Sequence, residues 1–68
     1  MAVNKVIELM SESEKSWEDA AQKAVSKAAK SIKGIRTVWV ESMSATVDGK
    51  GKLDTFRLTL KLAFEGKG

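Results

Sequence analysis

The 68-residue sequence contains no cysteine, no histidine and no proline. Without cysteine it can form neither disulfides nor thiolate metal sites, and without histidine it has no imidazole ligand and no Ser-His or Cys-His pair. Carboxylates such as Glu18 and Asp19 belong to no recognisable catalytic motif, so we interpret them as solvated surface groups. We therefore expect no enzyme activity and no catalytic residue.

A long hydrophobic run is also missing. No segment approaches the roughly 18 apolar residues that a membrane helix requires. Polar residues interrupt the N-terminal stretch MAVNKVIELM, and no small-residue cleavage site follows it. We therefore expect a soluble, cytoplasmic protein that has no secretory signal and no membrane partner.

The chain also lacks a large excess of one sign of charge. The net charge is +3, from 12 basic and 9 acidic residues, and we interpret the lysines and glutamates as interspersed on a solvated surface. A nucleic-acid interface is typically a basic stripe with interleaved aromatic residues, and the sequence shows no such stripe. We therefore expect no nucleic-acid partner.

The length allows a single domain spanning residues 1–68. A core of this size contributes only a few kcal/mol, and small natural proteins add disulfides, metals or partner chains to it. Disulfides are excluded here and zinc has no suitable ligands. Self-association is the remaining source of stability, and we expect it.

Hydrophobic periodicity predicts four elements. Val3–Met10 is typical of a strand, and Trp17–Ile32 carries an uninterrupted apolar stripe, mostly alanine, at helical spacing. Ile35–Val47 predicts a second strand, and Leu53–Glu65 alternates apolar and polar residues almost ideally. The order β-α-β-β predicts an α+β fold, with a three-stranded antiparallel sheet packed on one helix.

Local signals mark where these elements begin and end. Ser13 is the favoured helix cap, with Ser16 as the alternative, and Gly34 is the residue expected to close the helix. DGKGK, Asp48 to Lys52, predicts a hairpin turn rather than a calcium loop, because lysines occupy the alternate positions where oxygen ligands would stand. The tail from Gly66 to Gly68 is expected to fray.

Two tryptophans require an interpretation. Trp17 begins the apolar helix stripe, and we expect it to pack near Ile7 or Leu9. Trp39 and Arg57 lie on the two arms of the predicted hairpin. They form either a stacking surface with hydrogen-bond donors or, more simply, a subunit contact.

The sheet face away from the helix has no cover of its own in this pattern. We predict that subunits pack around this exposed sheet surface and its edges. That face carries Trp39 or its neighbours, Met43, Arg57, Thr59 and Lys61, and the sequence leaves open which face Trp39 occupies.

From about Lys5 to Phe64 the chain resembles the dodecins. The resemblance is carried by the β-α-β-β order, by KVIELMSESEKSWEDAAQKAVSKAAKSIKGIR and by the closing FRLTLKLAFE. It implies a hollow homododecamer with helices outward and sheets inward, which fits the expected self-association. It also implies a non-enzymatic, small-molecule binding or storage protein.

In flavin-binding dodecins, a tryptophan early in the second strand stacks on the flavin and a glutamine in the third strand bonds to its edge. The matching positions here carry Thr37 and Arg57, and Trp39 lies two residues further along. The resemblance implies flavin (FMN or riboflavin) as the cofactor, with Trp39, Thr37 and Arg57 as the binding residues. The alternative is a flavin-free assembly that binds calcium through carboxylates such as Glu41 or has a structural role.

Overall fold

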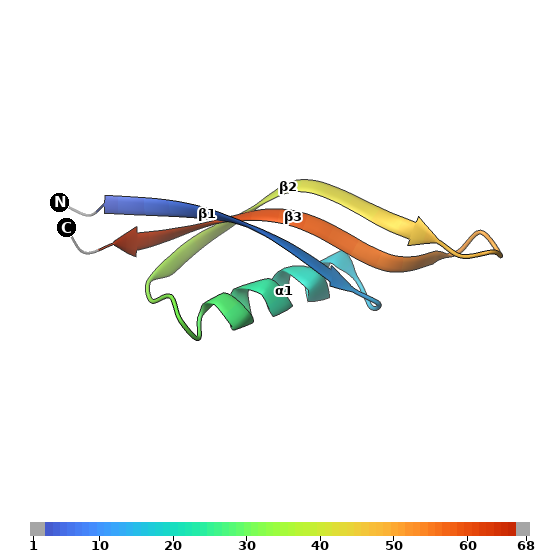
Figure 1. Cartoon of the computed structure of the whole chain (residues 1–68), viewed down its shortest axis with the longest axis horizontal. Helices are drawn as coiled ribbons and strands as arrows, with labels where there is room; N and C mark the ends of the chain where they lie inside the picture. Colours follow the sequence, from blue (N-terminus) through green and yellow to red (C-terminus); the bar gives the residue numbers. More distant parts are fainter. Residues whose placement is uncertain (1–2, 67–68) are drawn as a thin grey trace.

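The computed structural model describes residues 3–66 and contains one sheet and one helix (Figure 1). The elements follow in the order β1 (Val3–Ser13), α1 (Trp17–Ala28), β2 (Ile35–Val47) and β3 (Leu53–Gly66). The predicted β-α-β-β fold is therefore confirmed, and the bounds of the second strand agree with the prediction. Of the tail expected to fray, residues 67 and 68 lie outside the described residues, and residue 66 ends β3.

The third strand lies at the centre of the sheet, which has the order β1-β3-β2 with both pairs antiparallel. β1 pairs with β3 from Val3↔Gly66 to Ser13↔Phe56. The first strand is three residues longer than predicted because its polar end continues this ladder. Its backbone groups bond to β3 whatever side chains they carry, so alternation of apolar residues underestimates the strand.

The helix is shorter at its C-terminal end than the predicted Trp17–Ile32. It ends at Ala28, and tight turns follow, with Ser31 N–H donating to the Ala28 carbonyl at 3.1 Å. Gly34 does not close the helix as expected. Its φ of +79° instead turns the chain into β2, where an added Cβ would lie 3.3 Å from the carbonyl oxygen of Glu65.

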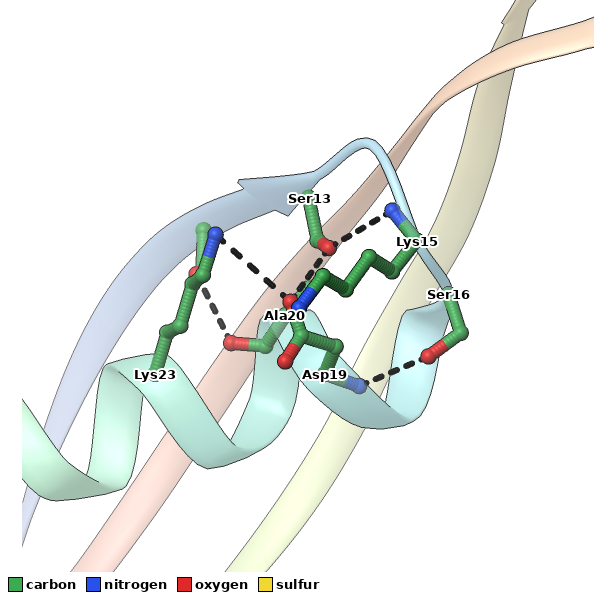
Figure 2. A network of polar contacts seen from close by, with 7 residues as sticks. Ser13, Lys15, Ser16, Asp19, Ala20 and Lys23 are labelled. Carbon is green, nitrogen blue, oxygen red and sulfur yellow. Dashed lines mark hydrogen bonds and ion pairs between the residues drawn. The ribbon is translucent and has the colours of Figure 1, made fainter.

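The helix begins at a serine cap, which is the predicted alternative. Ser16 Oγ accepts a hydrogen bond from the backbone N–H of Asp19 at 2.9 Å (Figure 2). Ser13, the favoured cap in the sequence, is instead the last residue of β1. The physical reason is that Ser13 is held in the ladder opposite Phe56, three residues before the first helical turn.

Ser13 takes a different role at the corner between β1 and α1. Its side chain is buried, and its hydroxyl donates to Asp19 Oδ2 at 2.5 Å and accepts from Lys15 N–H at 2.9 Å (Figure 2). This hydrogen bond, together with the ammonium of Lys23 at 3.5 Å, holds the pKa of Asp19 below its ordinary value, although desolvation opposes the shift. Ser11 Oγ adds a bond to the Ala20 carbonyl at 2.8 Å. Several polar contacts thus fix α1 against β1.

The core lies between α1 and the central strand. Leu60 and Ala20 are fully buried, and Leu58 and Ala24 complete the cluster. The alanines of the helix allow this close approach. Trp17 packs edge-to-face on Phe56 with ring centroids 4.8 Å apart, and its Nε1–H donates to the Ser44 carbonyl at 2.9 Å.

The place of Trp17 differs in part from the prediction. It belongs to the edge of the cluster that Leu9 also joins, but its direct partners come from β2 and β3. Ser44 of β2 and Phe56 of β3 thus meet the first turn of α1, and the pairing of β2 with β3 brings these two residues near each other.

The chain is elongated for its length. It extends 53 × 20 × 12 Å, and its radius of gyration is 14.1 Å. A compact domain of this size would have a radius of gyration of roughly 11 Å. Figure 1 shows the reason, because the β2–β3 hairpin extends well past the end of α1. Among residues 3–66, no helix is both long and apolar enough to cross a membrane.

Candidate functional site on the open sheet face

The helix covers one side of the sheet, and the register identifies the residues on the other side. Side chains paired across antiparallel strands point to the same face, and alternate residues of one strand share it. Because Leu60 faces α1, its neighbours Lys61 and Thr59 face away. We call this surface the open face. It comprises Val6, Glu8, Met10, Glu12, Thr37, Trp39, Ser42, Ser44, Arg57, Thr59, Lys61 and Ala63.

Trp39, whose face the sequence left open, lies on the open face and is 50% exposed. It pairs with Lys61 of β3, whose other neighbour across the sheet is Glu8 of β1. The Lys61 ammonium lies 3.4 Å from Glu41 Oε2. The indole therefore sits beside a salt-bridged cation, on a surface that no other part of residues 3–66 covers.

Arg57 shares the open face with Trp39 but is not its direct neighbour. It pairs with Ser44 of β2 and Glu12 of β1, and its Nε lies 3.6 Å from Glu12 Oε1. Arg57 lies four positions before Lys61 in β3, which corresponds to about 13 Å along the strand. Thr37 lies nearer to Trp39, two residues away and opposite Ala63. A single chain thus brings Thr37 and Trp39 together and leaves Arg57 apart.

A bulge in β2 explains a correction to the sequence analysis. The pairing shifts between Val40↔Leu60 and Ser42↔Thr59, so Glu41 is an extra residue opposite β3. Met43 therefore pairs with Leu58 and lies on the helix side of the sheet, not on the face of Trp39 as predicted. Simple alternation cannot find a bulge, because the extra residue reverses the two faces for the rest of the strand.

The hairpin turn from Asp48 to Lys52 has the structure predicted from its sequence. Asp48 Oδ1 accepts hydrogen bonds from the backbone N–H of Lys52 at 3.0 Å and of Lys50 at 2.8 Å. These bonds lower the pKa of Asp48. The left-handed residue is Gly51, at φ +81°. The carboxylate thus bonds to the backbone of its own turn, which supports the assignment as a turn.

No part of residues 3–66 forms a group of three or more acidic side chains that could hold a metal ion. Calcium takes six to eight oxygen ligands, which a lone carboxylate such as Glu41 cannot supply. Glu41 is also occupied by Lys61 within the chain. A calcium site built from one chain therefore does not fit these residues.

The sheet also exposes apolar groups on the side of α1. The helix packs mainly on β1 and β3, and it contacts β2 through the hydrogen bond from Trp17 to Ser44. Val38, Val40 and Met43 are 39%, 49% and 56% exposed on that side of β2. Trp39 is exposed on the open face, so β2 exposes apolar side chains on both faces. Val6 and Met10 of β1 add exposed apolar groups to the open face, as expected of a subunit in an assembly.

The β-α-β-β order, with a three-stranded antiparallel sheet packed on one helix, places this chain among small α+β proteins. The family model for Dodecin matches residues 3–67. The chain therefore belongs to the dodecin family, and the resemblance noted in the sequence is confirmed.

Relatives support the same assignment. Calcium dodecin of Mycobacterium tuberculosis is 40% identical over 65 residues, which are 96% of this chain and 90% of the relative. Its crystal structure, described as that of a calcium-chelating antigen with a novel calcium-binding site, has a TM-score of 0.79 over 96% of this chain and 91% of its own, at 38% identity. A variant of the Thermus thermophilus dodecin has a TM-score of 0.90 and 25% identity, with full coverage of both chains.

Proposed function

We propose that this chain is a non-enzymatic binding protein that assembles into a closed homododecamer and holds a small ligand at the contacts between its subunits. The observation that carries this proposal is the bare second strand, with apolar side chains exposed on both faces. The large radius of gyration supports it, since only further subunits can give so extended a chain a compact environment. Membership of the dodecin family agrees with it.

We propose calcium as the ligand. Support comes from the relative named calcium dodecin, which aligns with nearly the whole chain. Thr37 and Arg57 stand where the flavin-binding pattern has tryptophan and glutamine, which weakens the case for flavin. Since one chain offers no cluster of acidic side chains, the oxygen ligands must come from more than one subunit or from backbone carbonyls and water. Glu41, at the bulge of β2, is the carboxylate that we expect to contribute.

Flavin is the second candidate, and Trp39 is the observation that favours it. Its indole is half exposed on the open face, with the Lys61 ammonium close by, and such a surface suits a planar anionic ligand. Trp39 lies about 7 Å along the strand from Thr37, so a flavin would stack at a shifted place. In this hypothesis Trp39 stacks, Thr37 lines the site and Arg57 reaches the ligand from a neighbouring subunit.

Native mass spectrometry of the purified protein tests the assembly and both ligands together. We expect twelve copies, an added mass of calcium that a chelator removes, and a melting temperature that falls after chelation. A ligand at 100 times its Kd stabilises the folded state by about 2.7 kcal/mol. A mass of one chain would contradict the assembly, whereas twelve copies with no calcium would contradict the ligand alone.

Two substitutions separate the ligands. Glu41→Gln should weaken calcium binding, and its titration with riboflavin should give the same fluorescence as the titration of the wild type. Trp39→Ala should abolish any quenching of that fluorescence and leave calcium binding intact. If the wild type quenches riboflavin fluorescence and Trp39→Ala does not, flavin rather than calcium would be the ligand.

A further inference from the structure

The basic residues are unevenly distributed along the chain. Residues 20–40 contain five basic residues and no acidic one, while the rest of the chain has seven basic and nine acidic residues. The overall pI is 9.4. The mild net charge therefore hides a basic segment, which covers α1 after its acidic first turn, the turns that follow it and the start of β2.

Within this segment three lysines form a stripe on the helix. Lys23, Lys27 and Lys30 follow one another at i, i+4 and i+7, which places them on one side of α1 and the turn that continues it. All three are exposed. Their spacing along the axis is about 5–6 Å. Lys33 follows in the connection to β2 and is exposed as well. We call these four residues the lysine stripe.

Most of the stripe's charge is not neutralised within the chain. Lys23 lies 3.5 Å from Asp19, but the ion pairs found in residues 3–66 involve neither Lys27 nor Lys30 nor Lys33. The helix dipole favours cations in its last turn, which accounts for Lys27. It does not account for Lys33, which lies beyond the helix end.

The stripe lies on α1 and the turns after it, whereas the large exposed apolar side chains lie on the strands. Lys23 and Lys27 also line the groove between α1 and β1. The exposed apolar side chains belong to β1, β2, β3 and the hairpin, and the apolar side of α1 is turned to the sheet. Subunits that pack through the sheet would therefore leave the stripe accessible. Each added copy would also add one more stripe to the same particle.

We propose that the lysine stripe binds the phosphate backbone of duplex DNA without reading its sequence. Duplex DNA carries one negative charge per roughly 1.7 Å of its axis, so neighbouring lysines can each neutralise a phosphate. This revises the expectation that nucleic acid is no partner, which treated the charge as evenly mixed along the chain.

The composition of the stripe favours duplex DNA over other polyanions. A helix that lies on a membrane exposes large apolar residues for insertion, but the exposed residues between these lysines are Ser26, Ala29 and Ser31. Single strands are bound by stacking on exposed aromatic rings. Trp17, the aromatic residue of α1, is packed on Phe56.

Fluorescence anisotropy with a labelled 20-base-pair duplex tests the proposal on the assembled wild-type protein. We expect binding at low salt, with log K falling against log salt at a slope of about −3 for each engaged stripe. The double variant Lys27→Gln/Lys30→Gln should bind at least tenfold more weakly and with a slope smaller by about 2. Glutamine keeps the helix propensity, and circular dichroism checks that the fold is retained.

The matched control removes two lysines from the hairpin turn, in Lys50→Gln/Lys52→Gln. This variant has the same net charge as the stripe variant, and we expect it to bind like the wild type. Equal losses in both variants would overturn the proposal, since net charge alone would then explain binding. Absence of binding at low salt, or binding to anionic phospholipid vesicles without binding to the duplex, would overturn it as well.

Discussion

Leu60 and Val40 face each other across β3 and β2 on the same side of the sheet, yet their surroundings differ completely. Leu60 lies under α1 and is fully buried, whereas Val40 lies beyond the helix and is 49% exposed. One helix of 12 residues can cover only part of a sheet whose strands have 11 to 14 residues. The chain thus completes its core on β1 and β3 and leaves β2 exposed, and the proposed assembly would cover β2 with other subunits. The following predictions test that division.

The largest effect is expected where the chain supplies its own cover. Leu60→Ala would leave a cavity between Ala20 and Ala24 of the helix, and we expect a loss of roughly 2–5 kcal/mol in the free energy of unfolding. Urea denaturation followed by circular dichroism measures it. Leu53→Ala, at a residue that is 53% exposed, is the control and should cost much less. Similar losses of unfolding free energy in both variants would contradict a core between α1 and β3.

On the other side of the comparison, Val40→Asp should act on the assembly. A carboxylate at this site would be desolvated by a covering subunit, so we expect the particle to dissociate. Sedimentation velocity should show the mass fall from that of the assembly toward that of small species. Ser26→Asp adds the same group on the exposed side of α1 and should leave the mass unchanged. An intact assembly in Val40→Asp would mean that β2 is not a contact surface.

A smaller effect is expected at the link between the two regions. Gly34→Ala introduces a Cβ at φ +79° and 3.3 Å from the Glu65 carbonyl, so we expect a loss of roughly 1–2 kcal/mol. Gly49→Ala is the matched control, because Gly49 has no atom within 4 Å of an added Cβ. Thermal unfolding of the two variants should give clearly different melting temperatures. If they coincide, the turn into β2 does not require glycine.

The smallest effect concerns the corner between β1 and α1. The folded-state pKa of Asp19 is lowered, chiefly by the Ser13 hydroxyl, so the carboxylate stabilises the fold above its unfolded pKa. That contribution should be lost as the pH falls below about 4 and through the folded pKa. In Asp19→Asn the stability measured by denaturant titration should depend less on pH in this range. Glu18→Gln, on the neighbouring exposed residue, should retain the wild-type pH dependence.

The fold was largely predictable because its signals are local. The apolar stripe from Trp17 onward and the alternation in the last strand are properties of neighbouring residues. Both elements begin where they were expected, although the helix ends four residues before the predicted Ile32. The face that Trp39 occupies was not predictable in this way, because it depends on the pairing of β2 with β3. The use of Trp39 as a ligand platform stays a prediction, as do the roles of Thr37 and Arg57, since any site at these residues needs a second subunit to complete it.

The errors arose where distant parts of the chain decide the outcome. Ser13 looked like a helix cap, but the ladder with β3 holds it in β1 and leaves the cap to Ser16. Gly34 looked like a helix terminator, but the helix ends six residues earlier, at Ala28, and Gly34 turns the chain past Glu65. In both cases the residue type correctly indicated a local role, hydrogen bonding for Ser13 and a turn for Gly34. Contacts with β3 determined which structure each residue serves.

Periodicity alone determined that this polypeptide forms one helix and three strands, because apolar side chains repeat every 3.6 residues in a helix and every 2 residues in a strand. The lengths of these patterns also indicated that the sheet is larger than the area that one helix can cover. Only the folded chain decided that β3 lies in the centre, that Glu41 forms a bulge and that Met43 turns to the helix side. Register depends on hydrogen bonds between strands far apart in sequence, and a shift of one residue reverses the faces without changing the local pattern.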